Sequence, residues 1–173
     1  MMEEEEKQSE KPLTQEVSTV AKSLDVVPVT DWRYPKRPKE GYRTMPDYDS
    51  MILKMTKEQL MRVEEFTIEN KNGKIVFLGK TDLTDVDLAS DVTIKARSVE
   101  VYPDLATAAP KGTKLNKAAL VTLSGGVKPK NGSNLSAEEY ETQLESMVES
   151  KGGVHLSYDS GTFTWLFKVP CFE

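Results

Sequence analysis

Few side chains in this chain could carry covalent or metal chemistry. Its 173 residues include one cysteine, Cys171, and one histidine, His155. A zinc site in a protein needs about four nitrogen, sulfur or oxygen ligands, so no metal site is expected. His155 alternates with Val154 and Leu156, and with no positioned nucleophile beside it we interpret it as a solvent-facing structural residue. The sequence also lacks a glycine-rich phosphate loop and a serine-centred elbow, and no cofactor is predicted.

Lysines in two polar loops form a second set of candidate functional residues. In a chain of net charge -5, they could make a local positive patch that binds an acidic partner or RNA. The alternative is that they are ordinary solvated loop charges. The negative net charge argues against a surface that coats nucleic acid generally. The lysines are Lys111, Lys114, Lys117, Lys128 and Lys130.

Aspartates gather in the stretch between residues 82 and 91. Clustered carboxylates can bind a hard cation, but their spacing here lacks the pattern of a calcium-binding loop. The sequence therefore favours a solvated loop. These aspartates are Asp82, Asp85, Asp87 and Asp91.

Cysteine content and hydropathy restrict the compartment. One cysteine allows no intramolecular disulfide, which favours a reducing environment. No apolar run approaches the roughly 18 residues that span a bilayer, so membrane insertion is not expected. The N-terminal residues 1–6 (MMEEEE) are acidic, where a secretory signal would be basic and then apolar.

Composition divides the chain into three parts. Residues 1–25 are rich in Glu, Lys, Ser, Gln and Thr, and we expect a disordered tail because such a stretch buries little apolar surface. Residues 26–40 mix apolar anchors with prolines, which favours an extended strap lying on a surface, with a stiff linker as the alternative. Residues 41–173 make up the predicted domain, which is long enough for one hydrophobic core.

Helix-start signals occur at three places in this domain. Asp47 is a candidate N-cap, and Thr56 with Gln59 makes a capping-box pattern for a second short helix. Ser136 with Glu139 makes another capping box, ahead of a longer amphipathic helix. The apolar face expected of the first helix is Tyr48, Met51, Ile52 and Met55, and that of the longer one is Tyr140, Leu144, Met147 and Val148.

Alternating apolar residues predict several short strands. A hairpin is predicted around a turn at residues 70–73, where an Asn-Gly pair readily supplies a positive φ. Further strands are predicted near residues 92–94, 99–101 and 119–123. The loops are too short for βαβ crossovers, so the expected class is α+β, a mainly antiparallel sheet with two or three helices.

The last hairpin gives the clearest strand signal. Val154, Leu156 and Tyr158 alternate up to a turn at residues 159–161, and a second alternating run follows. Pro170 should end the pairing because it has no N–H to donate. The side chains of the second run that should face the core are Phe163, Trp165, Phe167 and Val169.

Several sequence blocks, taken in order, resemble one family. Residues 41–46 (GYRTMP) match Gly-Tyr-x-Thr-x-Pro, and residues 112–123 match Gly-x-x-Leu-Asn-x-x-Ala-x-Val-Thr-Leu. The ending, residues 161–172, is similar to Gly-x-Trp-x-Phe-x-Val-x-His-Phe. Together with weaker blocks at residues 66–77 and 83–102, this order resembles the nucleoporin autoproteolytic domain, found at the C-terminal end of the Gly-Leu-Phe-Gly nucleoporin.

This resemblance implies a fold and a role. The fold would be a half-open antiparallel sheet flanked by helices. The role would be to anchor a nucleoporin to the scaffold of the nuclear pore complex at the nuclear envelope. The partner would be a scaffold nucleoporin with an N-terminal β-propeller and associated helices, with links to mRNA export factors and protein transport.

The resemblance also implies a self-cleavage reaction at the end of the chain. In the family, the hydroxyl of the residue after a Phe attacks the Phe carbonyl, helped by a His two residues before the nucleophile. Here the Phe is Phe172, Glu173 occupies the nucleophile position and Cys171 occupies the His position. Lys168 matches a family lysine near the site but cannot replace both groups. We therefore predict that the chain does not cut itself, that these four positions are vestigial for catalysis, and that Phe172 serves as a structural plug and partner contact.

Alternatives to this non-catalytic docking domain remain. An active self-processing peptidase of the same family is one, and attack by Cys171 on the Pro170–Cys171 bond is disfavoured because nothing nearby in sequence activates the thiol. An RNA-binding module using the loop lysines is another. The absence of Phe-Gly dipeptides indicates either an excised domain or a paralogue that kept only the anchor, and Met1 favours a complete short protein.

Overall fold

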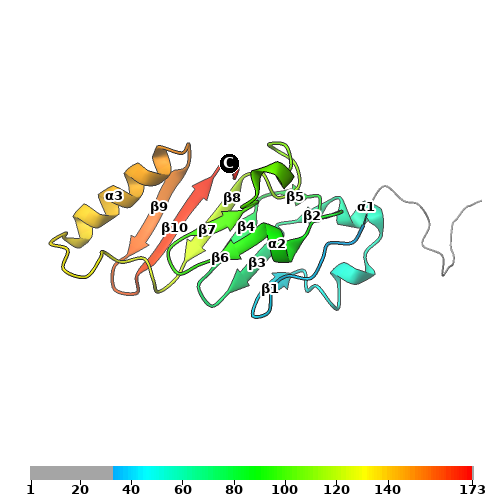
Figure 1. Cartoon of the computed structure of the whole chain (residues 1–173), viewed down its shortest axis with the longest axis horizontal. Helices are drawn as coiled ribbons and strands as arrows, with labels where there is room; N and C mark the ends of the chain where they lie inside the picture. The colour runs from blue at the N-terminus through cyan, green and yellow to red at the C-terminus, as the bar shows by residue number, and fades with distance from the viewer. Residues whose placement is uncertain (1–32, 173) are drawn as a thin grey trace, which may run out of the picture. The chain divides into compact units, whose positions relative to one another are not determined.

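A computed structural model describes residues 33–172, which form a mainly antiparallel sheet with helices packed against it (Figure 1). The predicted tail (1–25), the first part of the predicted strap (26–32) and Glu173 lie outside the described residues. The described residues form one six-stranded sheet and two two-stranded sheets. The α+β class predicted from the sequence is confirmed.

The elements follow one another in this order: β1 (Arg43–Met45), the 3-10 helix η2 (Ile52–Lys54), α1 (Lys57–Leu60), β2 (Val63–Glu64), β3 (Thr67–Asn70), β4 (Gly73–Phe77), β5 (Lys80–Thr81), α2 (Leu88–Asp91), β6 (Val92–Ile94), β7 (Val99–Val101), the 3-10 helix η3 (Leu105–Thr107), β8 (Ala119–Leu123), α3 (Ala137–Glu149), β9 (Val154–Asp159) and β10 (Thr164–Val169). The six-stranded sheet has the order β1-β3-β4-β8-β10-β9, and the two-stranded sheets are β2-β5 and β6-β7.

One face of the large sheet carries the core and the other is open. A row of aligned residues, Ile68, Ile75, Val121 and Phe167, crosses four strands, and all four side chains are buried. The side chains next along the strands point to the opposite face, where Lys74 is exposed and Thr122 is half-buried. The sheet is therefore half-open, as the family resemblance implied.

Residues 33–40 run along the domain ahead of β1. Lys36 makes an isolated parallel bridge with Asp87, and its N–H donates to the carbonyl of Val86 at 2.8 Å. The side chain of Pro35 is buried, and the Tyr48 hydroxyl donates to its carbonyl at 2.7 Å. This segment is held by backbone hydrogen bonds and apolar contact together.

Local capping signals predicted two of the helices well. The Thr56 and Gln59 side chains accept from each other's backbone N–H at the start of α1. Ser136 and Glu139 do the same at the start of α3, whose buried side chains are Tyr140, Leu144 and Val148. Met147, predicted on the same stripe, is instead 51% exposed.

The helix predicted after Asp47 is wrong, because residues 47–55 form turns and the single 3-10 turn η2. The Asp47 carboxylate accepts from the N–H and the hydroxyl of Ser50, at 2.9 and 2.8 Å, which stabilises a local turn in place of a helix N-terminus. Ile52 is fully buried, whereas Met51 is 52% exposed. The predicted apolar face is therefore divided between the core and the surface.

The positive φ predicted for the Asn72-Gly73 pair is also wrong, because neither residue is among those with a positive φ. A Cβ at Gly73 would lie 2.2 Å from the carbonyl oxygen of Thr122 on β8. Glycine is therefore needed here for the close approach of β4 to β8. The turn itself is held by the Asn70 carboxamide oxygen, which accepts from the N–H groups of Asn72 and Gly73.

The last hairpin contains a β-bulge that reverses the predicted alternation. In the β9–β10 pairing, His155 aligns with Phe167 and Ser157 with Leu166, so Leu156 is the extra residue. Val154 and Leu156 are consequently 50% and 46% exposed. The predicted solvent-facing position of His155 is wrong: its side chain is 10% exposed, with Nε2 2.8 Å from a carboxylate oxygen of Glu141 on α3.

The tautomer of His155 follows from its two neighbours. The indole Nε1–H of Trp165 donates to Nδ1 at 3.0 Å, so the ring proton sits on Nε2 and faces Glu141.

Phe163, predicted to start the inward-facing run, instead precedes β10 with a φ of 55°. Trp165 and Phe167 do face the core, with ring centroids 4.1 Å apart.

The bulged register of β9 and β10 leads to a testable prediction about stability. We expect His155→Ala to cost about 2 kcal/mol of unfolding free energy, because it leaves the Trp165 indole N–H without its acceptor. Leu156→Ala should cost less than about 1 kcal/mol, because the side chain is half exposed. Urea unfolding of both variants measures the difference. A larger loss for Leu156→Ala would contradict the bulged register.

Candidate functional site

The candidate site lies where the chain leaves β10. After Pro170, the backbone N–H of Phe172 donates to the Asn116 carboxamide oxygen at 2.8 Å. Asn116 is 1% exposed, and its NH2 group donates to the carbonyl of Ala109, also at 2.8 Å. The amide of Asn116 therefore joins the end of the chain to the loop that precedes β8.

The ring of Phe172 continues an aromatic stack in the core. Its centroid lies 5.9 Å from that of Phe77 on β4, and Phe77 lies 6.0 Å from Phe66. Phe66 and Phe77 are fully buried, and Phe172 is half-buried. Aromatic pairs in this distance range are favourable beyond their area alone, so Phe172 is held by both its backbone and its ring.

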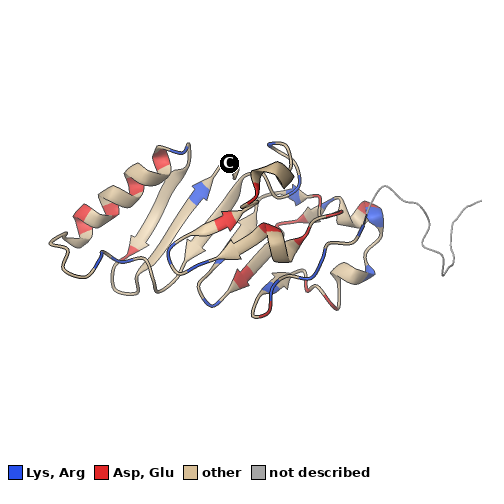
Figure 2. Ribbon diagram, viewed as in Figure 1, with Lys and Arg blue, Asp and Glu red and all other residues tan. Residues whose placement is uncertain are grey.

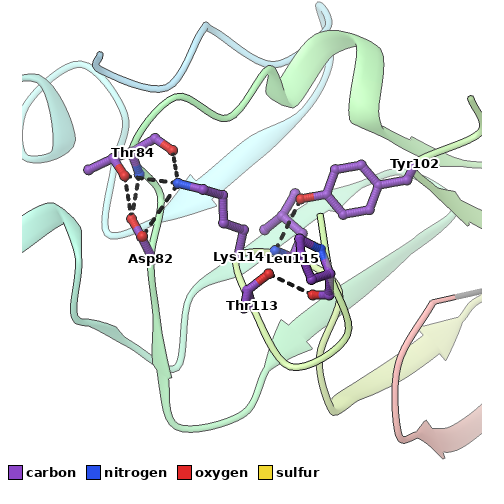
Figure 3. A network of polar contacts seen from close by, with 7 residues as sticks. Asp82, Thr84, Tyr102, Thr113, Lys114 and Leu115 are labelled. Atoms are coloured by element: carbon purple, nitrogen blue, oxygen red, sulfur yellow. Dashed lines mark hydrogen bonds and ion pairs between the residues drawn. The ribbon is translucent and has the colours of Figure 1, made fainter. Parts of the chain in front are cut away.

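A polar network positions the loop that carries Asn116 (Figure 3). The Lys114 ammonium donates to the carbonyl and the hydroxyl of Thr84 and lies 3.4 Å from a carboxylate oxygen of Asp82. The Leu115 N–H donates to the Tyr102 hydroxyl at 3.3 Å, and burial raises the pKa of this phenol. Lys114 adopts a φ of 47°, a left-handed conformation that the network offsets.

The five candidate lysines do not form one cluster. Lys111, Lys114 and Lys117 precede β8, whereas Lys128 and Lys130 follow it, at the opposite end of the strand. Lys117 donates to the carbonyl of Lys80 and to the Thr81 hydroxyl, and burial lowers its pKa. The ammonium of Lys128 lies 5.5 Å from the centroid of the Phe163 ring. The role of the five candidate lysines in partner binding stays a prediction.

Lys168 and Cys171 lie in different surroundings. Lys168 aligns with Leu120 and Val154, so its exposed side chain stands on the face opposite Phe167. Cys171 is a free, half-buried thiol. Glu173, at the position of the predicted nucleophile, lies outside the described residues.

A cavity of about 390 Å³ adjoins Cys171 and Phe172. We call it the terminal groove; it lies between β7 and α3, and the exposed side chains of Leu105 and Met147 contribute to it. Arg97 and Lys151 supply its cations. Sequence reasoning missed this groove because α3 and β7 bring separate stretches of the chain to one place. Its main apolar lining is Val99, Val101, Leu123, Val148, Phe167 and Val169.

Residues 33–172 do not meet the requirements of a metal site or a membrane span. Among residues 33–172, no three His, Cys, Asp or Glu side chains gather closely enough to hold a metal ion. Within the same range, no helix has the length and apolar character of a membrane span. Asp87, one of the clustered aspartates, accepts from the N–H groups of Ala89 and Ser90 and caps α2.

The network around Lys114 predicts a measurable loss of stability. Lys114→Met should lower the unfolding free energy by about 1–2 kcal/mol, because Asp82 and Thr84 lose a charged donor at a partly buried site. Lys71→Met is the matched control, since Lys71 is exposed in the β3–β4 turn, and we expect it to change stability by less than about 0.5 kcal/mol. Equal effects in thermal unfolding would show that the network does not hold the loop.

The fold and its C-terminal site together define a nucleoporin-type autoproteolytic domain. The family model described as Nucleoporin2, Nup98-96 autopeptidase S59, matches residues 39–173, and the chain belongs to this family. The resemblance stated from the sequence is thereby confirmed.

Relatives and solved structures agree with this assignment. The chain is 34% identical over 146 residues to the Dictyostelium discoideum nuclear pore complex protein Nup98-Nup96, and 31% identical over 148 residues to the Arabidopsis thaliana protein NUP98A. These matches cover 80% of this chain but only 7% and 14% of the two relatives. The crystal structure of a Chaetomium thermophilum Nup145N APD mutant fused to Nup145C N matches with a TM-score of 0.64 and 30% identity, over 76% of this chain and 94% of that one.

Proposed function

We propose that this chain is a docking domain of the nuclear pore complex that does not cleave itself. It anchors a nucleoporin to the pore scaffold at the nuclear envelope and so supports nucleocytoplasmic transport, including mRNA export. Its partner is a scaffold nucleoporin with an N-terminal β-propeller and associated helices. The observation that carries the proposal is the fixed position of Phe172, held by Asn116 and Phe77 beside an apolar groove.

The terminal groove supports the docking part of this proposal. It is lined mainly by apolar side chains and flanked by charged ones, the composition expected of a site that takes a protein segment. Leu105 is 70% exposed and Met147 is 51% exposed, so large apolar side chains meet the solvent at its edge. Burial of these side chains against a partner would contribute to binding.

The residues at the end of the chain support the absence of cleavage. An acyl shift needs a nucleophile and a base positioned beside it. Glu173 supplies no hydroxyl, and Cys171 has neither an ion pair nor a side-chain hydrogen bond with any described residue that could activate its thiol. The exposed side chain of Lys168 stands on the face of the sheet opposite Phe167, which argues against a role for it as the base.

Affinity purification from native cells, with the partners identified by mass spectrometry, tests the proposal. We expect a propeller-containing scaffold nucleoporin with the unmodified chain, and its loss with Met147→Glu, which places a charge in the terminal groove. Leu156→Glu is the matched control, because Leu156 is 46% exposed on the β9 bulge outside that groove. A tagged chain spread evenly through the cytosol, with no scaffold nucleoporin bound, would contradict the anchoring role.

A further inference from the structure

A second groove lies on the N-terminal part of the domain and plays no part in the proposed function. It is a surface depression of about 730 Å³ bordered by η2, α1 and the β2–β5 pair, and no residue lines both grooves. We call it the methionine groove. Its lining residues are Pro46, Ser50, Met51, Lys54, Met55, Gln59, Arg62, Val63, Glu64 and Lys80.

The apolar part of this groove is built from flexible side chains. Met51 is 52% exposed and Met55 is half-buried, with Pro46 beside them. Outside the lining, Met61 is 45% exposed in the turn after α1. Methionine adapts its shape to varied partners and is frequent on surfaces that bind peptides. Exposed apolar side chains that line one groove are a common feature of interaction surfaces.

The charged part of the groove is positive. Lys54, Arg62 and Lys80 line it against one carboxylate, Glu64. None of these three cations makes an ion pair with another described residue, whereas most other arginines and several lysines of the domain do. In Figure 2, blue stretches of the ribbon mark Lys or Arg positions on η2, α1 and β5. In a chain of net charge -5, this is a local excess of unpaired positive charge.

We propose that the methionine groove binds an acidic amphipathic segment of a protein partner. Carboxylates of that segment would pair with Lys54, Arg62 and Lys80, and its bulky apolar side chains would lie against Met51 and Met55. Charge complementarity of this kind sets specificity and association rate. A single-stranded nucleic acid fits less well, because such ligands stack on aromatic rings and the groove lining contains none.

A binding titration tests the charge requirement. The probe is a labelled synthetic peptide whose leucines form one face of an amphipathic helix and whose glutamates form the other. Its counterpart carries lysine at every glutamate position. We expect the acidic probe alone to bind the full chain, with an affinity that falls as salt rises. The double variant Lys54→Glu, Lys80→Glu should weaken binding at least about tenfold. Lys71→Glu, Lys74→Glu is the matched control, since both lysines are exposed outside the groove, and it should bind like the unmodified chain.

The oxidation rates of individual methionines show which groove the probe binds. Met51 and Met147 are 52% and 51% exposed, so dilute hydrogen peroxide should oxidise them at similar rates in the free chain. The acidic probe should slow oxidation of Met51 severalfold and leave Met147 unchanged. Protection of Met147 instead would place the probe in the terminal groove and overturn the assignment.

Other outcomes also overturn the proposal. They are no binding of the acidic probe at millimolar concentration, equal binding of the lysine counterpart, and an unchanged affinity in the Lys54→Glu, Lys80→Glu variant. Concentration-dependent dimerisation that protects Met51 without any peptide would show that a second copy of the chain fills the groove. Failure of the scaffold-anchoring proposal leaves these measurements unaffected, because they use no scaffold nucleoporin.

Discussion

A variant that carries both Cys171→His and Glu173→Ser is expected to cleave its own peptide bond after Phe172. The two changes supply a hydroxyl at the nucleophile position and an imidazole two residues before it, the pair that the family reaction requires. The Phe172 N–H is already bonded to Asn116, so the residue before the cleaved bond is held in place. We expect the fraction of cleaved molecules to rise from none in the unmodified chain to most in the variant. Intact mass spectrometry measures this cleavage as the loss of the final residue.

Matched variants separate the chemistry from the fold. Cys171→His with Glu173→Ala retains the new base but lacks the hydroxyl, and it should stay intact. Cleavage in that variant would show a nucleophile other than the residue after Phe172. If the Cys171→His, Glu173→Ser variant remains intact although its circular dichroism matches that of the unmodified chain, the two substitutions are not what prevents cleavage.

A Phe77→Ala variant is expected to lose about 3–5 kcal/mol of unfolding free energy, since a fully buried aromatic ring is removed. Phe77 contacts both Phe66 and Phe172 in the aromatic stack, so the cavity would lie between two rings that cannot collapse freely. For a domain of this size, the melting temperature should fall by about 10 °C. Differential scanning calorimetry measures it.

Val76→Ala is the control on the same strand. Val76 is half-buried on the open face of the sheet, and its truncation should cost about 1 kcal/mol. The Phe77→Ala variant should also make residues 170–172 more accessible to carboxypeptidase, because Phe172 loses its ring contact. Equal losses for the two variants would contradict the assignment of the core to one face of the sheet.

Local sequence signals predicted the elements that local interactions determine. The two capping boxes and the paired strands around residues 70–73 depend on residues three or four positions apart, and all are present. The helix prediction after Asp47 is wrong for a local reason, since the Asp47 side chain stabilises a turn as readily as a helix start.

Features that depend on distant residues were not readable from the sequence. One extra residue in β9 exchanges the inner and outer positions of residues 154 and 155, and nothing in the alternation of residues 154–158 marks it. The need for glycine at position 73 arises from Thr122 on another strand. The hydrogen bond between Phe172 and Asn116 joins residues 56 positions apart, although the family resemblance had placed both in its motifs.

The candidate lysines show the same contrast between features that local sequence predicts and features that depend on distant residues. Their positions in loops were readable, but the engagement of Lys114 with Asp82 and Thr84 depends on a loop thirty residues upstream. The methionine and terminal grooves could not be predicted, because each collects residues from three or more elements. The sequence shows that the chain contains methionines and cationic residues, but it does not show which of them are exposed or lie in one groove.

The central proposal is that this member of the family does not cut itself. Intact mass spectrometry of freshly made protein tests this most directly. We expect a single species of the full 173 residues, apart from removal of the initiator methionine, that persists on incubation. Loss of Glu173 would show cleavage after Phe172, and loss of residues 171–173 would show attack by Cys171; either result would contradict the claim.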